Sequence, residues 1–195
     1  MTRASLGREL RRKAVHAFGI VLLPLSWVSP NAVVLCLFLL VVGYWVLETR
    51  ARLGHPTPGL TALIQSCKLQ HRLESLDPGP IYLAAVVGLA FLFLPLPAAQ
   101  IGLIHIPLAD AAASLAPHYL PARWKLPHSA RKSWTGSLTF FLVAWAGTLF
   151  FLSWPQALLI AALGTLLESL PPRDIDNLTV PLGVALLVTL TGWLG

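Results

Sequence analysis

Charged side chains are scarce in this sequence of 195 residues. Only 11% of the residues are Asp, Glu, Lys or Arg, whereas 56% are hydrophobic. An average soluble domain carries about 25% charged residues, so this balance excludes an ordinary soluble fold. The composition instead predicts a single integral membrane domain over residues 1–195.

Cysteine is also rare, with two residues in the chain. Cys36 lies in a hydrophobic stretch and Cys67 in a segment expected to face the cytosol, so we expect no disulfide between them. No pair of cysteines has the spacing of a metal site. We therefore assign no functional role to either cysteine.

The few charged residues form clusters that leave four stretches without Asp, Glu, Lys or Arg. These stretches are residues 14–47, 78–109, 133–167 and 177–195. One bilayer crossing needs about 20 mostly apolar residues, so the first three stretches are long enough for two crossings each and the last for one. Prolines near the three midpoints indicate turns. These turns are expected at Ser29-Pro30-Asn31, at Pro95-Leu96-Pro97 and at Trp154-Pro155.

Three helical hairpins and one further helix give an all-α, polytopic membrane protein with about seven transmembrane helices. The expected spans lie near residues 14–28, 32–47, 79–95, 99–117, 134–152, 156–170 and 178–194. Because a hairpin returns the chain to the side that it left, every charged cluster faces the same side of the membrane. Lys and Arg concentrate on the cytoplasmic side, so we expect the basic arm of residues 1–13 to be cytoplasmic.

The net charge of +6 raises the question of nucleic acid. The basic residues flank the expected spans, where contact with anionic lipid head groups is the commoner reason for them, so we expect no nucleic-acid partner.

The basic start resembles a signal peptide, but residues 27–29 offer no small-x-small cleavage site, and we expect a retained first helix. The expected location is a prokaryotic plasma membrane, with the active site on its cytoplasmic face. The sequence indicates no oligomeric state.

Four groups of residues on the expected cytoplasmic side are candidates for chemistry. The first is Arg12-Lys13-x-x-His16, whose members share one helix face. Taken alone, the two cations are better explained as side chains that anchor the span at the interface. A histidine inside the first turn of a span is costly without a partner or a task, so His16 is a candidate phosphate ligand or proton carrier.

The second candidate is Asp110, the carboxylate placed well inside an expected span. An ionisable residue at that depth is a functional hypothesis by default, and Pro107 frees backbone groups that can line a polar cavity. The small residues that follow, such as Ala111 and Ala113, also permit close helix packing. Packing does not account for the aspartate, so we expect a catalytic or metal-binding role for it.

The third group is Lys132-Ser133-Trp134-Thr135-Gly136-Ser137, at the expected start of a span. A helix N-terminus presents unpaired N–H groups and binds phosphate readily. Lys132 adds charge, Ser133 and Ser137 add hydroxyl donors, and Gly136 allows a ligand to approach the backbone. The alternative is an ordinary serine cap beside an anchoring lysine.

The fourth group joins Glu168 to the run Asp174-Ile175-Asp176-Asn177. Carboxylate oxygens suit Mg²⁺ held together with substrate phosphates, whereas the alternative is a solvated acidic turn that caps the last helix.

Two further features lie in the segment after the second expected span. The side chain of Glu48 either faces the substrate or lies on the solvated surface. Leu60, Leu63 and Ile64 have helical spacing, which favours a helix at the membrane interface.

Together these groups predict an enzyme that brings a polyphosphate to a lipid, by phosphoryl or nucleotidyl transfer. Four motifs in sequence order resemble the family of dolichol kinases, phytol kinases and CTP-dependent diacylglycerol kinases. The matching residues are Glu9-Leu10-x-Arg12-Lys13-x-x-His16, Asp110-Ala111-x-Ala113, Lys132-Ser133-x-x-Gly136-Ser137, and Glu168 with Asp176-Asn177-Leu178-Thr179-Val180-Pro181-Leu182. The resemblance implies transfer of the γ-phosphate of CTP, with Mg²⁺, to the hydroxyl of a membrane lipid alcohol: a polyprenol, a phytol-like alcohol or diacylglycerol.

Under this hypothesis the catalytic residues are Asp110, His16 and Lys132. The residues expected to bind the nucleotide phosphates are Arg12, Lys13, Lys132, Ser133, Gly136, Ser137 and Asn177. Asp110 is either the base or a metal ligand, and the candidate metal ligands are Asp110, Glu168 and Asp176.

Two alternative functions remain. A phosphatidate cytidylyltransferase would also use CTP, but its Lys-Asp pair and Asp-Arg-x-x-Asp stretch do not occur here; a non-enzymatic transporter or scaffold would need polar groups along a path to the outer face.

Overall fold

The computed structural model describes residues 3–68, 76–120, 124–127, 129–170 and 175–193, and this part of the chain is mostly helical. The helices are α1 (Arg3–Phe18), η1 (Gly19–Val21), α2 (Leu22–Val28), α3 (Pro30–Arg52), α4 (Leu60–Cys67), α5 (Gly79–Phe93), α6 (Leu96–Ile104), η3 (His105–Asp110), α7 (Ala111–Tyr119), α8 (Trp134–Thr148), α9 (Trp154–Ser169) and α10 (Asp176–Leu190). Each predicted span falls on one of these helices or on a consecutive run of them. The helical character of all seven segments is therefore confirmed.

The predicted mostly helical fold is confirmed, with one short β-hairpin before α8 that the sequence analysis did not predict. Strand β1 (Lys125–Leu126) pairs antiparallel with β2 (Ser129–Ser133). Along β1, Lys125 is exposed and Leu126 is buried, which is the alternation of a half-buried strand. The hairpin places Lys132 directly before the start of α8.

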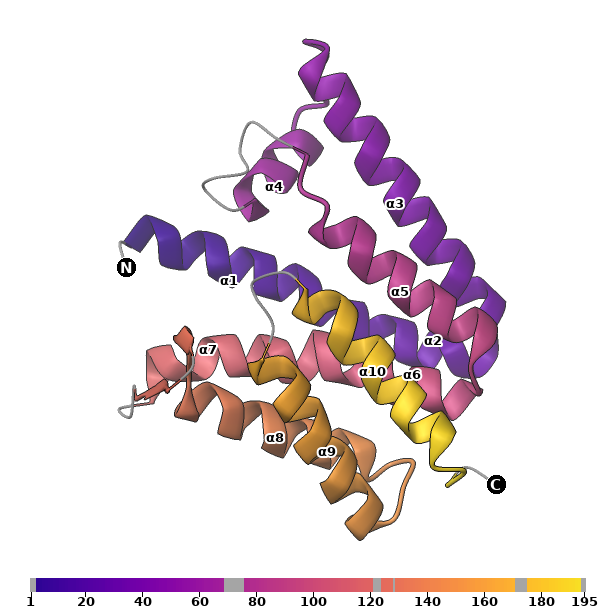
Figure 1. Cartoon of the computed structure of the whole chain (residues 1–195). Coiled ribbons are helices and arrows are strands. Elements are labelled where there is room, and N and C mark those ends of the chain that lie inside the picture. Colours follow the sequence, from indigo (N-terminus) through magenta and orange to yellow (C-terminus); the bar gives the residue numbers. More distant parts are fainter. Residues whose placement is uncertain (1–2, 69–75, 121–123, 128, 171–174, 194–195) are drawn as a thin grey trace.

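The three predicted turns lie between α2 and α3, between α5 and α6, and between α8 and α9. Ser29 caps α3, its Oγ accepting from the Ala32 amide at 3.2 Å, and Pro30 follows at the first helical position. Pro95 separates α5 from α6, and Ser153 begins α9 with a capping box to Gln156. Figure 1 shows these three turns and the C-terminal end on one side of the molecule, and the N-terminus and α4 on the other.

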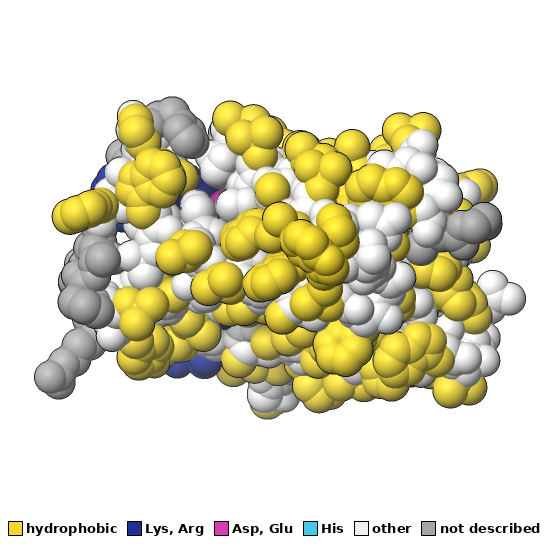
Figure 2. All heavy atoms as spheres, turned by 90° about the horizontal axis from the view of Figure 1, so that it is seen from below, with side chains coloured by type: hydrophobic (Ala, Val, Ile, Leu, Met, Phe, Trp, Pro, Cys, Tyr) yellow, Lys and Arg dark blue, Asp and Glu magenta, His cyan; other side chains and the backbone are white. Residues whose placement is uncertain are grey.

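Two helices among the described residues are long and apolar enough to cross a bilayer, judged by length and composition. They are Pro30–Arg52 and the continuous run Leu96–Tyr119, while Gly79–Phe93 and Asp176–Leu190 are shorter apolar helices. The count of seven crossings therefore stays a prediction. Large hydrophobic side chains are nevertheless exposed on most helices and in the turn after α8, with Phe38 61%, Phe93 77% and Phe150 86% exposed. Figure 2 shows one such face, largely covered by hydrophobic side chains, with Lys and Arg only toward its left part.

Two irregular turns face each other in the middle of the bundle. The 3₁₀ turn η1 precedes Pro24, and the π-helical turn η3 contains Pro107; proline has no N–H to donate to the preceding turn. A Cβ added at Gly19 would lie 3.7 Å from Pro107 Cβ, so the two turns are in contact. Single π-helical turns occur frequently at functional sites, and this one carries Asp110.

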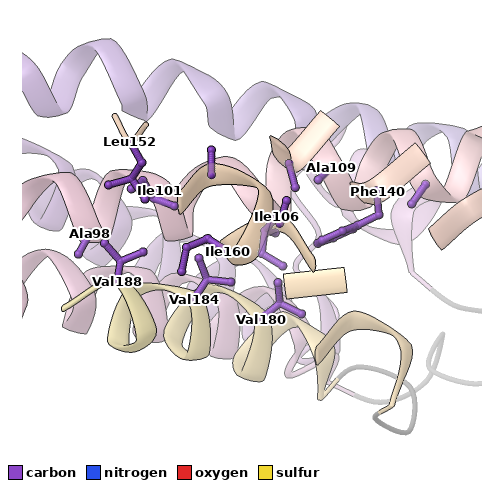
Figure 3. Packing of buried hydrophobic residues seen from close by; sticks show 14 residues of the cluster. Ala98, Ile101, Ile106, Ala109, Phe140, Leu152, Ile160, Val180, Val184 and Val188 are labelled. Atoms are coloured by element: carbon purple, nitrogen blue, oxygen red, sulfur yellow. The ribbon is translucent and has the colours of Figure 1, made fainter. Parts of the chain in front are cut away.

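The main core lies where α10 packs against α6, η3 and α9, and where α8 packs against η3 and α9. Its buried members include Ala98, Ile101, Ile106, Phe140, Ile160, Val180 and Val184. Figure 3 shows these side chains interleaved between the helices. A second cluster around Val33, Val87 and Leu103 attaches the α3–α5 hairpin to α6 and α10.

Glycine permits the closest helix crossing in this core. A Cβ added at Gly102 of α6 would lie 2.5 Å from the carbonyl oxygen of Pro181 in α10. Backbone atoms cannot move aside as a flexible side chain can, so any larger residue would push α6 and α10 apart. The crossing also holds the segment that continues into η3 and Asp110.

We predict that Gly102→Ala destabilises the protein by about 1–3 kcal/mol, the usual cost of overpacking a core. Thermal unfolding of the detergent-purified protein measures the effect as a lower Tm. The matched control is Gly43→Ala in α3, where nothing lies within 4 Å of the added Cβ and the better helix propensity of alanine stabilises by up to about 1 kcal/mol. Equal Tm values for the two variants would contradict the tight crossing.

Candidate active site

A buried ion pair joins the N-terminal helix to the π-helical turn. Lys13 Nζ of α1 donates to Asp110 Oδ2 of η3, and the side chains are 5% and 12% exposed. A buried charge that lacks a partner costs several kcal/mol, so each of these residues requires the other. The pair connects positions that are 97 residues apart in the chain.

Arg12 and His16 flank this pair on α1. Arg12 Nε and His16 Nδ1 are buried and have no hydrogen-bond partner within the described part of the chain. His16 interacts electrostatically with Asp110 and also with Asp176 of α10. The face of α1 predicted from the sequence thus points into a polar region, with hydrogen-bonding capacity left for a ligand.

A second ion cluster forms around Lys132 at the end of β2. Its Nζ donates to Glu168 Oε1, to the Glu168 carbonyl oxygen at 2.6 Å and to Asp176 Oδ2 at 3.2 Å. Partial burial alone would lower the pKa of Lys132, but the carboxylates of Glu168 and Asp176 outweigh that effect and raise it above its usual value. The two carboxylates therefore favour the charged form of Lys132.

The two clusters form one site. Glu168 interacts electrostatically with Asp110, as His16 does with Asp176. Three cations, Arg12, Lys13 and Lys132, here accompany three carboxylates, Asp110, Glu168 and Asp176. The site thus draws on α1, η3, β2, α9 and α10, and the catalytic residues expected from the sequence lie within it.

The start of α8 is used partly by the protein itself. Ser133 is its N-cap, with Oγ accepting from the Gly136 amide at 3.1 Å. A Cβ at Gly136 would lie 2.9 Å from the Ala113 carbonyl oxygen of α7. The space beside Gly136 is therefore filled by a neighbouring helix rather than open to a ligand, which differs from the expectation for this glycine. Ser137 Oγ, in contrast, is buried without a partner in the described residues.

Asn177 lies in the first turn of α10 and is buried. Its backbone amide donates to Asp176 Oδ1 at 3.0 Å. The residue is thus adjacent to the Lys132 cluster, and its role in phosphate binding stays a prediction. Asp174, which the sequence placed in the same acidic run, lies outside the described residues.

The carboxylates fit a nucleotide-bound magnesium ion better than a closed metal site. No group of three or more His, Cys, Asp and Glu side chains in the described ranges is placed to hold a metal on its own. Mg²⁺ that arrives with substrate phosphates needs only one or two protein carboxylates. Glu168 and Asp176 converge on one point, and Glu168 Oε2 is buried without a described partner, so this pair suits the ion.

Another buried ion pair shows that the solvated alternative for Glu48 is wrong. Glu48 near the end of α3 is 2% exposed and accepts from Lys68 Nζ and from Gln65 Nε2 at 3.3 Å, with Arg52 3.8 Å away. It holds α4, which the sequence placed correctly as a helix, against α3. The position of Glu48 at the end of an uncharged stretch gave no sign of which residue would pair with it.

Comparison with known proteins places this arrangement in a family. No family model matches the chain, and no solved structure matches it. The phytol kinase of Synechocystis sp. is 31% identical over 214 residues, which cover 100% of this chain and 86% of the relative. A probable chloroplastic phytol kinase of Triticum aestivum and phytol kinase 1 of Arabidopsis thaliana are each 27% identical, over 96% and 94% of this chain and 69% and 67% of the relatives. The chain therefore belongs to the phytol kinase family, whose members are phosphotransferases with an alcohol as acceptor.

Proposed function

We propose that this chain is an integral membrane lipid kinase that transfers the γ-phosphate of CTP to the hydroxyl of a lipid alcohol. Family membership supports the alcohol acceptor, and the names of the relatives favour a phytol-like alcohol over diacylglycerol. CTP as donor rests on the motif resemblance. The observation that carries the proposal is the cluster of Lys13, Asp110, Lys132, Glu168 and Asp176 between the helices of an apolar bundle.

The membrane topology belongs to the same proposal. Seven spans in a single domain, with a cytoplasmic N-terminus, would place the ion cluster at the cytoplasmic head-group level. The large exposed hydrophobic side chains support a lipid environment, because soluble monomers rarely expose apolar patches of this extent. The arrangement of all three turns on one side of the molecule supports the hairpin order.

The cations act on the charge that develops on the transferred phosphoryl group. The transition state of phosphoryl transfer spreads negative charge over the equatorial oxygens, so catalysis depends on positioned cations and N–H or O–H donors. Lys132, Lys13 and Arg12 supply the charge, and Ser137 Oγ supplies an unused hydroxyl. Ser133 and Asn177 lie beside these groups and complete the phosphate site in this proposal.

The transfer forms a bond between the alcohol oxygen and the γ-phosphorus and breaks the bond from that phosphorus to the β–γ bridging oxygen. The nucleoside diphosphate leaves, and the hydroxyl proton passes to His16 Nδ1, a buried nitrogen without a partner in the described residues. Asp110 holds Lys13 in place, and its negative charge is already compensated by that lysine. Glu168 and Asp176 would hold the Mg²⁺ of the nucleotide, which neutralises phosphate charge when bound.

The proposed activity predicts transfer of label from γ-labelled CTP into lipid. Detergent-purified protein is incubated with Mg²⁺, γ-labelled CTP or ATP, and phytol, a polyprenol, diacylglycerol or phosphatidate. We expect labelled lipid phosphate and CDP with an alcohol acceptor, and about a 100-fold lower kcat for Lys132→Met because a transition-state cation is lost. Lys125→Met removes an exposed cation from the same hairpin and should keep wild-type turnover.

Other products would redirect the assignment. Labelled pyrophosphate formed with phosphatidate would identify a cytidylyltransferase, and transfer from ATP alone would correct the donor. Absence of turnover with every pair, in protein that remains folded, would contradict the kinase.

The seven-span topology predicts which positions a membrane-impermeant maleimide labels in a chain with Cys36→Ser and Cys67→Ser. Single cysteines at Asn31 and Phe150, both exposed near the predicted outer turns, should react in intact cells. Cysteines at His55 and Lys125 should react only after the membrane is opened. Labelling of an inner and an outer position from the same side would contradict the hairpin arrangement.

A further inference from the structure

Lys132 Nζ occupies a position surrounded by hard oxygen acceptors. Glu168 Oε1, the Glu168 carbonyl oxygen at 2.6 Å and Asp176 Oδ2 at 3.2 Å all accept from this one ammonium group. Carboxylate and carbonyl oxygens that converge on one point form the donor set that Mg²⁺ and similar divalent cations prefer. In this structure the lysine fills that position.

The charge around Lys132 is not balanced by the lysine alone. One ammonium carries a single positive charge, whereas Glu168 and Asp176 together carry two negative charges when ionised. Glu168 Oε2 is buried and has no hydrogen-bond partner in the described residues, so the carboxylates have acceptor capacity that Lys132 does not use. A divalent cation would match both the charge and the remaining acceptor.

The Lys13 and Asp110 pair lacks this surplus. There the one carboxylate that Lys13 contacts balances one ammonium, and both side chains are largely buried. The two lysines thus lie in different environments, although both are paired with acidic residues. Two carboxylates and a carbonyl oxygen contact Lys132, whereas one carboxylate contacts Lys13, and this difference marks the Lys132 position as the one suited to exchange of a cation.

We infer that Lys132 occupies the divalent-cation position between Glu168 and Asp176 in the resting protein and leaves it when Mg²⁺ arrives with the nucleotide. This inference rests on the proposed function, since it concerns the same site. The displaced ammonium then needs a new negative partner, and the nucleotide phosphates supply one. Lys132 directly precedes the N-cap of α8, and Ser137 of that helix keeps an unused hydroxyl.

This exchange makes the binding of metal and nucleotide interdependent. A free divalent cation has to displace Lys132 into a site without a counter-charge, so it binds weakly by itself. The metal–nucleotide complex brings phosphates for the displaced lysine and binds well. The lysine therefore changes its role during binding, from a substitute for the metal to a ligand of the phosphates.

Mn²⁺, an EPR-visible substitute for Mg²⁺, tests the inference without nucleotide, lipid or turnover. Free Mn²⁺ is measured by EPR in titrations of wild-type protein, Lys132→Met and Lys13→Met. We expect Lys132→Met to bind one Mn²⁺ at least about tenfold more tightly than wild type, because removing a unit charge a few ångströms away changes the Coulomb energy by more than a tenfold effect requires. Lys13→Met should show no such gain.

A combined variant locates the ion. Adding Glu168→Gln and Asp176→Asn to Lys132→Met should abolish the tighter Mn²⁺ binding. A gain that survives these two substitutions, or a wild-type protein that binds Mn²⁺ as tightly as Lys132→Met, overturns the exchange.

Loss of Lys132 can also destabilise the fold, since it leaves two carboxylates without their cation. The inference then predicts that Lys132→Met is recovered as folded protein when Mn²⁺ is present throughout purification and lost when EDTA is added. A variant that stays unfolded with the ion present contradicts the inference. Because no step measures kinase activity, failure of this test is distinguishable from failure of the proposed function.

Discussion

The ion pair between Lys13 and Asp110 is the constraint on which the rest of the site depends. A carboxylate inside an apolar bundle is stable only with a partner, and the partner of Asp110 is Lys13 of α1, 97 positions earlier in the chain. The close contact of Gly19 with Pro107 brings α1 against η3 so that this pair can form. Once α1 lies there, Arg12 and His16 necessarily face the same polar region.

The second half of the site has the same physical basis. Lys132, Glu168 and Asp176 come from three separate segments that meet at the ends of α8, α9 and α10. The tight crossing of α6 and α10 at Gly102 fixes the position of α10, and with it Asp176. Ionic residues from distant segments are thus held by apolar packing in the middle of the bundle. In the proposed topology, this arrangement would keep the charges at the head-group level and leave the apolar outer surface of the bundle to lipid.

The helical framework was predictable because its signals are local. Uncharged stretches marked the helices, and Pro30, Pro95 and Pro155 marked the turns between them. The residue types at the site were predictable for the same reason: Asp110 and His16 are costly where they stand unless they have a role. The Ser133 cap was one of two readings that the sequence left open.

What the sequence did not supply was pairing. Lys13 with Asp110 and Lys132 with Glu168 are contacts across 97 and 36 positions, and no periodicity encodes them. The same holds for Glu48, whose burial against Lys68 depends on where α4 folds back. The packing role of Gly136 depends on α7, which is a separate segment. The position of the π-helical turn η3 depends in the same way on its contact with η1.

The most direct test of the account separates the structural from the catalytic role of the Lys13–Asp110 pair. Tm and kcat are measured for Lys13→Met, Asp110→Asn and the double variant. We predict that Lys13→Met loses about 3–5 kcal/mol of stability, because it leaves a buried carboxylate unpaired, and that the double variant recovers most of this stability but no activity. Near-normal turnover in Asp110→Asn or in the double variant would contradict the central claim that this ion pair is part of the catalytic centre.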